Sequence, residues 1–282
     1  MEVRINQHGP NSLATKVFFS DESGFEVASV IVIGKTDAVL IDAQFVLSNA
    51  HRVVAEIQET GKHLKTIYVT HAHPDHYFGL ETFAETFPEA RVIALPSVAR
   101  TINNQFSRKI EHWEKTIGVT NTPRKGVNIE PLAENYFELE GHRIEIIPEI
   151  MGDLKYNTVV WIPSIKTLYG SDVLFNQAHA FTCEVTAEER QQWIRDIERL
   201  EKMGAEVVIP GHQKPGMPFD STSFSFTRDY LVATEEELAK TNDEAGFYYA
   251  MVKRFPDANL FISNEMNSGV FKGGMDWNWR ED

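Results

Sequence analysis

A cluster of histidines and one aspartate lies between Thr70 and His76, directly after an apolar run. Within it, His71, His73 and His76 supply imidazoles and Asp75 supplies a carboxylate, so four metal-binding side chains fall within six residues. These groups are ligands that Zn²⁺ or Fe²⁺ prefers, and a strand ending in a turn can present all of them to one small volume. The alternative is a polar loop that is rich in histidine by chance. With ten histidines in 282 residues, we reject that alternative.

This cluster resembles the signature of the metallo-β-lactamase superfamily, His-x-His-x-Asp-His at the end of a strand. Residues 71–76 match every specified position. The segment Leu168–Phe175 resembles the strand that carries the metal-bridging aspartate of the family, which places Asp172 in that role. The segment Val207–His212 resembles the strand whose Gly-His ending supplies the last histidine ligand, here His212.

A fourth segment, Asp37–Ala43, resembles an early strand of the family whose terminal aspartate lies beneath the metals. That aspartate falls on Asp42, which we expect to support ligands rather than to bind metal. The resemblance covers residues from about 25 to 215. It implies two divalent metal ions, with zinc expected first and iron or manganese as alternatives. The ligand set that it implies is His71, His73, Asp75, His76, Asp172 and His212, with one more residue from a later loop.

That later loop is where the chain departs from the family, which usually supplies a histidine there. Alignment on Asn157–Pro163 places Asp153 at the histidine position, and the chain has no histidine between His142 and His179. A carboxylate ligand would shift the metal preference toward iron or manganese. Asp153 could instead orient a histidine by a hydrogen bond, or the first metal site could be incomplete.

The resemblance implies hydrolysis by a metal-bound hydroxide, because a bound metal lowers the pKa of water to about 7. Asp75, a ligand beside the nucleophile, is the candidate catalytic residue that orients it or carries a proton. Cys183 lacks a context that would activate a thiolate, so we expect it to serve in packing.

Aromatic and apolar side chains near the candidate ligands predict a pocket for a small-molecule substrate, an apolar or aromatic ester, lactone or amide. Trp113 is a candidate for the rim of this pocket. The candidate substrate-binding residues are Tyr77, Phe78, Met151, Tyr156, Phe175 and His179. Two other functions remain open: an iron-dependent oxidoreductase of the same fold, and a metal-binding module without catalysis.

The pattern of strands and helices that must position these residues is typical of layered α/β packing. By resemblance, it is a four-layer αββα sandwich with metals at one edge. We expect a hairpin from Val27–Gly34 and Ala38–Ala43, and a helix capped by Ser48. Further strands are expected at 66–69, 91–94, 136–139, 143–147, 158–162, 167–169 and 206–209, and helices at 80–87, 96–117 and 187–203.

We predict two parts, a metallo-β-lactamase-like domain at 1–220 and a helical extension at 221–282 packed on it. The extension should hold helices at 226–240 and 247–255. Residues 119–135 are expected to form a long loop over the site. The late aromatic residues fit an interface, a lid or simple core packing: Phe261, Phe271, Trp277 and Trp279.

Composition limits the class of partner. The formal net charge of −14 argues against nucleic acid, because phosphate binding needs clustered Lys and Arg, and it disfavours an anionic membrane surface. With a single cysteine, no intrachain disulfide can form. The residues that begin this sequence lack the basic patch and apolar core of a signal peptide, so we expect a cytoplasmic protein. A homo-oligomer remains open.

Overall fold

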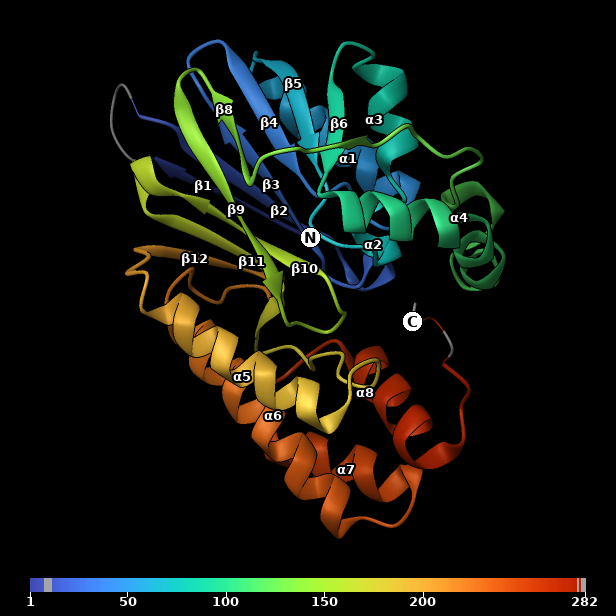
Figure 1. Ribbon diagram of the computed structural model, residues 1–282. Coiled ribbons are helices and arrows are strands. Elements are labelled where there is room, and N and C mark those ends of the chain that lie inside the picture. Colours follow the sequence, from blue (N-terminus) through green and yellow to red (C-terminus); the bar gives the residue numbers. More distant parts are fainter. Residues whose placement is uncertain (8–11, 278, 280–282) are drawn as a thin grey trace.

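A seven-stranded sheet and a five-stranded sheet face each other, with helices on the outer face of each (Figure 1). The computed structural model describes residues 1–7, 12–277 and 279. The predicted four-layer αββα arrangement is confirmed. Because each sheet buries one face against the other and one against helices, most strands are apolar on both faces.

The seven-stranded sheet is antiparallel at its start and parallel where it approaches the histidine cluster. Strands β1 to β4 pair antiparallel, and β4 to β7 pair parallel. Since parallel strands align their carboxyl ends, the loops after β4 and β5 meet at one edge. The strands are β1 (Glu2–Gln7), β2 (Ala14–Phe19), β3 (Ala28–Ile33), β4 (Asp37–Ile41), β5 (His63–Tyr68), β6 (Arg91–Ala94) and β7 (Glu130–Pro131).

The five-stranded sheet has the order β12-β11-β10-β9-β8, in which only β11 and β12 run parallel. Both of these strands end near the candidate metal ligands. Every residue of β11 is buried, in keeping with a central strand covered on both faces. The strands are β8 (Tyr136–Leu139), β9 (His142–Ile150), β10 (Asn157–Ile162), β11 (Thr167–Asn176) and β12 (Val207–Gln213).

The outer helices cover the two sheets. Helices α1, α3 and α4 lie beside the seven-stranded sheet, whereas α5 and α6 pack beside the five-stranded sheet (Figure 1). The α-helices are α1 (Leu47–Glu59), α2 (Pro74–Tyr77), α3 (Leu80–Thr86), α4 (Pro96–Ile117), α5 (Ala187–Glu201), α6 (Thr222–Lys240), α7 (Glu244–Arg254) and α8 (Phe261–Ser268). Single 3₁₀ turns occupy Glu22–Gly24, Val119–Asn121 and Pro163–Ile165, and a π-helical turn occupies Gly269–Gly273.

Most predicted elements lie within a few residues of the observed ones, and the differences are local. Helix α1 begins after Val46 without a side-chain cap, so the predicted cap at Ser48 is wrong. The capping box of Thr186 and Glu189, which the sequence indicates, does start α5. Strands β1 and β2 and helix α8 were not predicted, nor was the short helix α2 within the histidine cluster.

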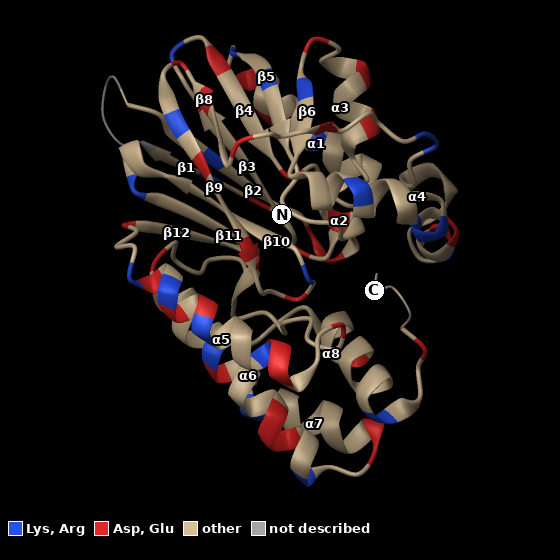
Figure 2. Cartoon of the chain, viewed as in Figure 1, with Lys and Arg blue, Asp and Glu red and all other residues tan. Residues whose placement is uncertain are grey.

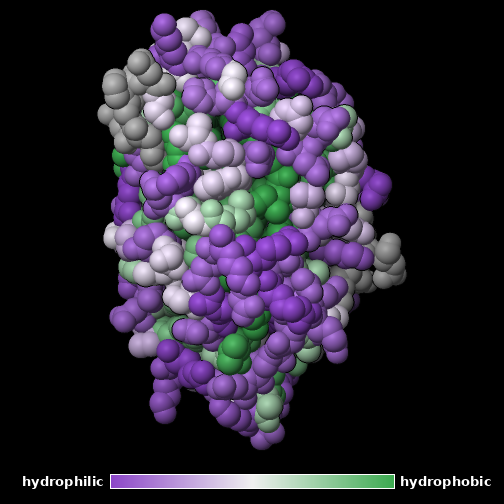
Figure 3. Space-filling model, turned by 60° about the vertical axis from the view of Figure 1, so that its left-hand side comes forward, coloured by the Kyte–Doolittle hydropathy of each residue, from purple (hydrophilic) through white to green (hydrophobic). Residues whose placement is uncertain are grey.

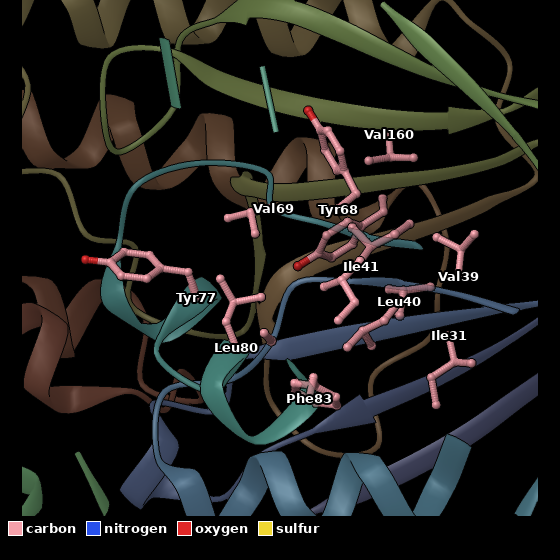
Figure 4. Packing of buried hydrophobic residues seen from close by; sticks show 14 of the residues in the cluster. Ile31, Val39, Leu40, Ile41, Tyr68, Val69, Tyr77, Leu80, Phe83 and Val160 are labelled. Carbon is pink, nitrogen blue, oxygen red and sulfur yellow. The ribbon is translucent and has the colours of Figure 1, made fainter. Parts of the chain in front are cut away.

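The buried apolar residues form two clusters on opposite faces of the five-stranded sheet. One lies between the sheets and under the helices of the first sheet, as Figure 4 shows around Leu40, Ile41 and Val69. The other lies between the five-stranded sheet and helices α5 to α7. Neighbouring residues of β10 divide between them, Val160 in the first and Val159 in the second, because successive strand residues face opposite sides.

At the end of the sandwich where β4 begins, one carboxylate joins the two sheets. Glu140, in the turn between β8 and β9, accepts hydrogen bonds from the backbone N–H groups of Lys35, Thr36 and Asp37, at 2.6, 2.6 and 2.9 Å. Gly34 allows this approach, because a Cβ there would lie 2.7 Å from Glu140 Oε2. We call this contact the turn clamp.

Charged side chains lie mainly on the outer surface, and both signs alternate along α5 (Figure 2). On the face in Figure 3, hydrophilic side chains predominate and hydrophobic ones show in small patches. None of the helices in the described part of the chain has the length and apolar character that crossing a membrane requires.

Candidate metal centre

The candidate ligands lie on or shortly after the strands β5, β9, β11 and β12, which come together at one edge of the sandwich. Strand β5 leads into the histidine cluster, whose second half forms the short helix α2 with Pro74 in its first turn. The loop between β9 and β10 supplies Asp153. The interiors of two neighbouring strands, β11 and β12, supply Asp172 and His212.

Two groups of candidate ligands lie around Asp172, which belongs to both. The first joins it to His71, His73 and Asp153, and the second to Asp75, His76 and His212. Within each group, the potential ligand atoms all lie within 4.8 Å of one another. All seven predicted ligand residues are therefore brought together, and all seven are buried.

The first group contains two imidazoles and two carboxylates. His73 Nδ1 lies 2.8 Å from Asp153 Oδ2, and His71 Nε2 lies 3.6 Å from Asp172 Oδ2 and 3.9 Å from Asp153 Oδ1. Asn157 donates a hydrogen bond of 2.9 Å to the other oxygen of Asp153 and so fixes the carboxylate plane. Asp153 thus lies beside both histidines of the first group.

The second group is closer to the strand β12. His76 Nε2 lies 3.1 Å from Asp172 Oδ1, and His212 Nε2 lies 3.2 Å from Asp172 Oδ2. The carboxylate of Asp75 lies 3.6 Å from His76 and 3.4 Å from His212. At these spacings the ligand atoms of the second group are close enough together to share one cation.

Each imidazole has one nitrogen held by the protein and the other directed at the cluster. His76 Nδ1 lies 2.7 Å from Asp42 Oδ2, and His212 Nδ1 lies 2.7 Å from the carbonyl oxygen of Phe25. His71 Nδ1 faces the hydroxyl of Thr70 at 3.1 Å. This arrangement is the usual support for metal-binding histidines, since it fixes the ring and its tautomer.

Several buried atoms of the cluster lie close to one another but form no well-aligned hydrogen bond within the described residues. A buried polar atom without a partner costs about 1–3 kcal/mol, so a group of them at one point requires an explanation. Divalent cations fit, because lone pairs of nitrogen and oxygen would then point at positive charge. The unpartnered atoms are His71 Nε2, His76 Nε2, Asp153 Oδ2 and Asp172 Oδ1.

Asp42 lies directly behind the cluster. Its carboxylate accepts hydrogen bonds from the Thr70 backbone N–H at 2.9 Å and from the Tyr169 hydroxyl at 2.8 Å, besides its contact with His76. Its backbone has a positive φ of 61°, which is uncommon for a residue other than glycine. Asp42 belongs to neither candidate ligand group, in agreement with its predicted supporting place.

Gly211 allows the strands β11 and β12 to approach at the cluster. A Cβ at this position would lie 2.2 Å from Asp172 Oδ1 and 2.6 Å from the backbone carbon of Ser171. Any larger residue before His212 would therefore displace the carboxylate that both groups share.

Burial and neighbouring charge perturb the pKa values throughout the cluster. Burial lowers the pKa of His71 well below its usual value. Burial also opposes the charged form of His212, but the carboxylates of Asp172 and Asp75 outweigh it and raise the pKa of His212 to about 10. Burial raises the pKa of Asp153. Such shifts in a buried cluster are typical of functional sites.

Glu184 is a buried carboxylate that sequence reasoning missed. Its Oε2 lies 3.3 Å from His73 Nε2, on the opposite side of the ring from Asp153, and accepts a hydrogen bond of 2.6 Å from the indole N–H of Trp277. His73 lowers the pKa of this carboxyl to about 2, against the effect of burial. Glu184 follows Cys183 in a loop without a recognisable motif, so no sequence signal indicated it.

A cavity of about 60 Å³ opens beside the candidate ligands. Asp75, Asp153, Asp172 and His212 contribute to one side of it, and Lys109 of α4 is its one lining lysine. The rest is largely apolar. Those lining residues include Phe25, Trp113, Phe175, Phe181, Leu260, Ile262, Met266 and Trp277.

Of the six predicted substrate-binding residues, Phe175 lines this cavity and the other five do not. Tyr77 and Phe78 line a separate pocket with Phe106 of α4. Figure 4 shows Tyr77 extending from α2 away from the strand residues Leu40 and Ile41. In a helical turn, neighbours of a ligand point in other directions, which explains this misassignment.

The remaining three lie outside the cavity for separate reasons. His179 is buried, with Nδ1 3.1 Å from the Tyr230 hydroxyl, and its burial lowers its pKa to about 4. Tyr156 is exposed at the surface. Met151 is half-buried, and its backbone N–H donates to Asp196 of α5.

The wall opposite the ligands comes from late in the chain. Residues 260–266 and Trp277 line the cavity, whereas residues 119–135, which were expected to cover the site, do not. The C-terminal segment returns to α4, where Gln105 donates a hydrogen bond of 2.8 Å to the carbonyl of Trp279 (Figure 1).

The chain matches a known protein family in sequence. Residues 23–212 match the sequence model of the metallo-beta-lactamase superfamily. A metallo-beta-lactamase type 2 of Pseudomonas aeruginosa is 23% identical over 229 residues, which cover 79% of this chain and 82% of that protein.

Solved structures of metallo-beta-lactamases share the fold of this chain. A metallo-beta-lactamase from Pontibacter korlensis aligns with a TM-score of 0.61 at 20% identity, covering 82% of this chain and 99% of that one. The DIM-1 metallo-beta-lactamase exposed to ceftazidime aligns with a TM-score of 0.61 at 22% identity, covering 82% and 97%. At these identities the structural likeness establishes the fold alone.

Proposed function

The chain belongs to the metallo-beta-lactamase superfamily, and from that premise we propose that it is a metal-dependent hydrolase of small molecules. The superfamily is generally hydrolytic. The observation that carries the proposal is the convergence of buried, unpartnered nitrogen and oxygen atoms on two overlapping groups that share Asp172. We propose two divalent cations as the cofactor, with zinc first and iron or manganese as alternatives.

The proposed substrate is an apolar or aromatic ester, lactone or amide, because the cavity beside the candidate ligands is lined mainly by apolar side chains. Divalent cations, when bound, would lower the pKa of a water molecule to about 7 and polarise a carbonyl group. We propose that Asp75 orients the attacking water or carries its proton, which its position in the cavity lining, 3.4 Å from His212 Nε2, supports.

The supporting residues hold this arrangement before substrate arrives. Asp42 orients His76, Glu184 orients His73, and the Phe25 carbonyl orients His212. The aromatic walls exclude water from the reacting groups, which strengthens every electrostatic interaction among them.

The proposal is tested by metal quantification together with a panel of aryl esters, lactones and β-lactams. We expect one to two divalent ions for each chain and turnover of at least one class. Asp75→Ala should abolish that turnover. Asp229→Ala, which removes an exposed aspartate on α6, is the matched control and should not change it. A fully loaded protein that turns over no class, or an unaffected Asp75→Ala variant, contradicts the proposal.

A second candidate function, an iron-dependent oxidoreductase, is favoured by one observation. Asp153 gives the first group two histidines with carboxylates, and two histidines with a carboxylate form the usual ligand set of non-haem iron enzymes. Purification without added metal distinguishes the two. Near-stoichiometric iron with oxygen uptake supports the oxidoreductase and contradicts the hydrolase.

Asp153→His separates an enzyme from a metal-binding module without catalysis. If Asp153 is tuned to the reaction, its replacement by the usual histidine should lower turnover. If the carboxylate abolished catalysis, the same replacement should create activity in a chain that had none.

A further inference from the structure

Lys109 is a buried cation in the wall of the cavity. It lies on α4 with 1% of its surface exposed, and it lines the cavity with Asp75, Asp153 and Asp172. Lysine is almost never fully buried unless it is paired. Within the described residues Lys109 forms no ion pair, and its recorded contact is the face of the Trp279 ring, 4.3 Å from Nζ.

The surroundings of this ammonium group compensate its burial only in part. Burial removes the ammonium group from water, and a cation–π contact offsets only part of that cost. Burial lowers the pKa of Lys109, and the carboxylates of Glu184, Asp75 and Asp153 act against this shift from a distance. Donors of the ammonium group therefore remain available to an oxygen that enters the cavity.

The apolar wall restricts what such an oxygen can belong to. Trp113, Phe181 and Met266 line the same cavity as Lys109. A ligand that fills it must therefore present an apolar or aromatic body together with an acceptor for one cation. A charged acceptor satisfies a buried ammonium better than a neutral one, because the attraction of opposite charges adds to the hydrogen bond.

We propose that Lys109 is the anion-binding residue of this cavity, so that the substrate is an apolar or aromatic ester, lactone or amide that also bears a carboxylate or similar acid group. The proposal rests on the proposed hydrolase function and narrows its substrate class. The competing explanation is that Lys109 only balances the carboxylates around it. That role predicts no discrimination between an acid and its neutral analogue.

The test is equilibrium binding of phenylacetate and phenylacetamide to the metal-loaded protein by calorimetry. The two probes share an aromatic ring and differ in charge. We expect wild type to bind phenylacetate more tightly, and Lys109→Met to lose about tenfold in affinity for phenylacetate with little change for phenylacetamide. Lys109→Arg should keep most of the preference. Any contribution of the metal to carboxylate binding is common to all variants at equal metal loading.

Lys115→Met is the matched control, because it removes an exposed lysine from the same helix. It should bind both probes as wild type does. Quenching of tryptophan fluorescence, from Trp113 and Trp277 in the wall, reports that a probe occupies the cavity. If Lys109→Met fails to fold, Lys109→Gln keeps a polar head without the charge and gives the same comparison.

Equal losses for both probes, an unchanged affinity of Lys109→Met for phenylacetate, or no binding to wild type would each overturn the proposal. These outcomes are independent of the hydrolase test, which measures turnover of aryl esters, lactones and β-lactams rather than equilibrium binding of the two probes. Turnover of neutral esters without acid discrimination refutes the role of Lys109 alone. Acid discrimination without turnover of any ester, lactone or β-lactam refutes the hydrolase alone.

Discussion

At one end of the sandwich Glu140 accepts hydrogen bonds from the turn between β3 and β4, and at the other end Asp172 lies among four histidines. Strands β4 and β9 connect the two ends: β4 runs from the turn clamp to Asp42, and β9 runs from it toward Asp153. Both ends use a carboxylate to join two sheets. Glu140 is exposed with its acceptors satisfied, whereas Asp172 is buried and keeps an oxygen without a partner.

This difference in hydrogen bonding indicates that the two carboxylates serve different purposes, one in stability and one in metal binding. The turn clamp satisfies its hydrogen bonds within the chain and needs nothing further, so its contribution is to stability. The cluster around Asp172 keeps polar atoms without hydrogen bonds and several charges buried, which costs free energy. Variants at one end should therefore change metal-dependent properties, and variants at the other should change properties that do not depend on metal.

The largest effect is expected for Asp172→Asn, because Asp172 belongs to both candidate ligand groups. We expect turnover to fall by about 10³-fold or more, since the water would lose its activation. Zinc should raise the melting temperature of wild type by preferential binding to the folded state, and this increment should disappear in the variant. Thermal melts with and without zinc measure it. A variant that keeps the full zinc increment would show that Asp172 is not a shared ligand.

Glu184→Gln should have an intermediate effect on metal affinity at the cluster around Asp172. The amide keeps the shape but not the charge that orients His73, and loss of such a partner lowers metal affinity by about 10–100-fold. Competition with a fluorescent chelator measures the affinity. Glu188→Gln, at an exposed position at the start of α5, is the control and should retain wild-type affinity.

A smaller change, Trp277→Phe, removes the indole N–H that donates to Glu184 while it keeps an aromatic wall. We expect metal affinity to fall less than in Glu184→Gln, because the carboxylate charge near His73 persists. The same chelator competition ranks the two variants. If Trp277→Phe lost more metal affinity than Glu184→Gln, the packing of the Trp277 ring, rather than its hydrogen bond to Glu184, would determine metal affinity.

The smallest effect is expected for Glu140→Gln at the turn clamp. Hydrogen bonds from Thr36 and Lys35 lower the pKa of Glu140 to about 2, from an ordinary value of 4.5. Because the folded pKa is depressed, its contribution to stability is present above pH 4.5 and is lost as the pH falls toward 2. The variant should melt about 2 °C lower at neutral pH, equally with and without zinc, and turnover should be unchanged.

Two observations would contradict this account of the clamp. One is a Glu140→Gln variant whose stability difference from wild type stays constant between neutral and strongly acidic pH. The other is a difference that depends on zinc. Glu138→Gln, at an exposed residue of β8 outside the clamp, is the control and should show no such pH-dependent difference.

The sequence indicated the ligand cluster more reliably than its surroundings. His71, His73 and His76 are specified by local spacing, and the resemblance to a family supplied Asp172 and His212. The substrate pocket had no such guide. Tyr77 was chosen because it follows the ligands, but the short helix α2 turns its side chain away from the cavity.

The walls of the site depend on contacts distant in sequence, which spacing does not encode. Lys109, Glu184 and Trp277 come from a helix, a loop and a late segment that share no motif. Each of them lies near the candidate metal ligands because separate elements pack together. The sequence predicted most of these elements one by one, and it did not predict α8. Long-range tertiary contacts, rather than local propensity, decide such positions.

The candidate metal ligands and part of the cavity wall are far apart in the sequence, and this separation affects how the site forms. All the candidate metal ligands precede residue 213, whereas the apolar wall at 260–277 is synthesised later. Because chains fold from the N-terminus during synthesis, the nascent protein presents its ligand-bearing sheets to the surrounding solution before the wall is made. Ions can therefore bind before the wall is made, and we expect ions supplied during cell-free synthesis to give a more uniformly occupied protein than ions added to the finished chain.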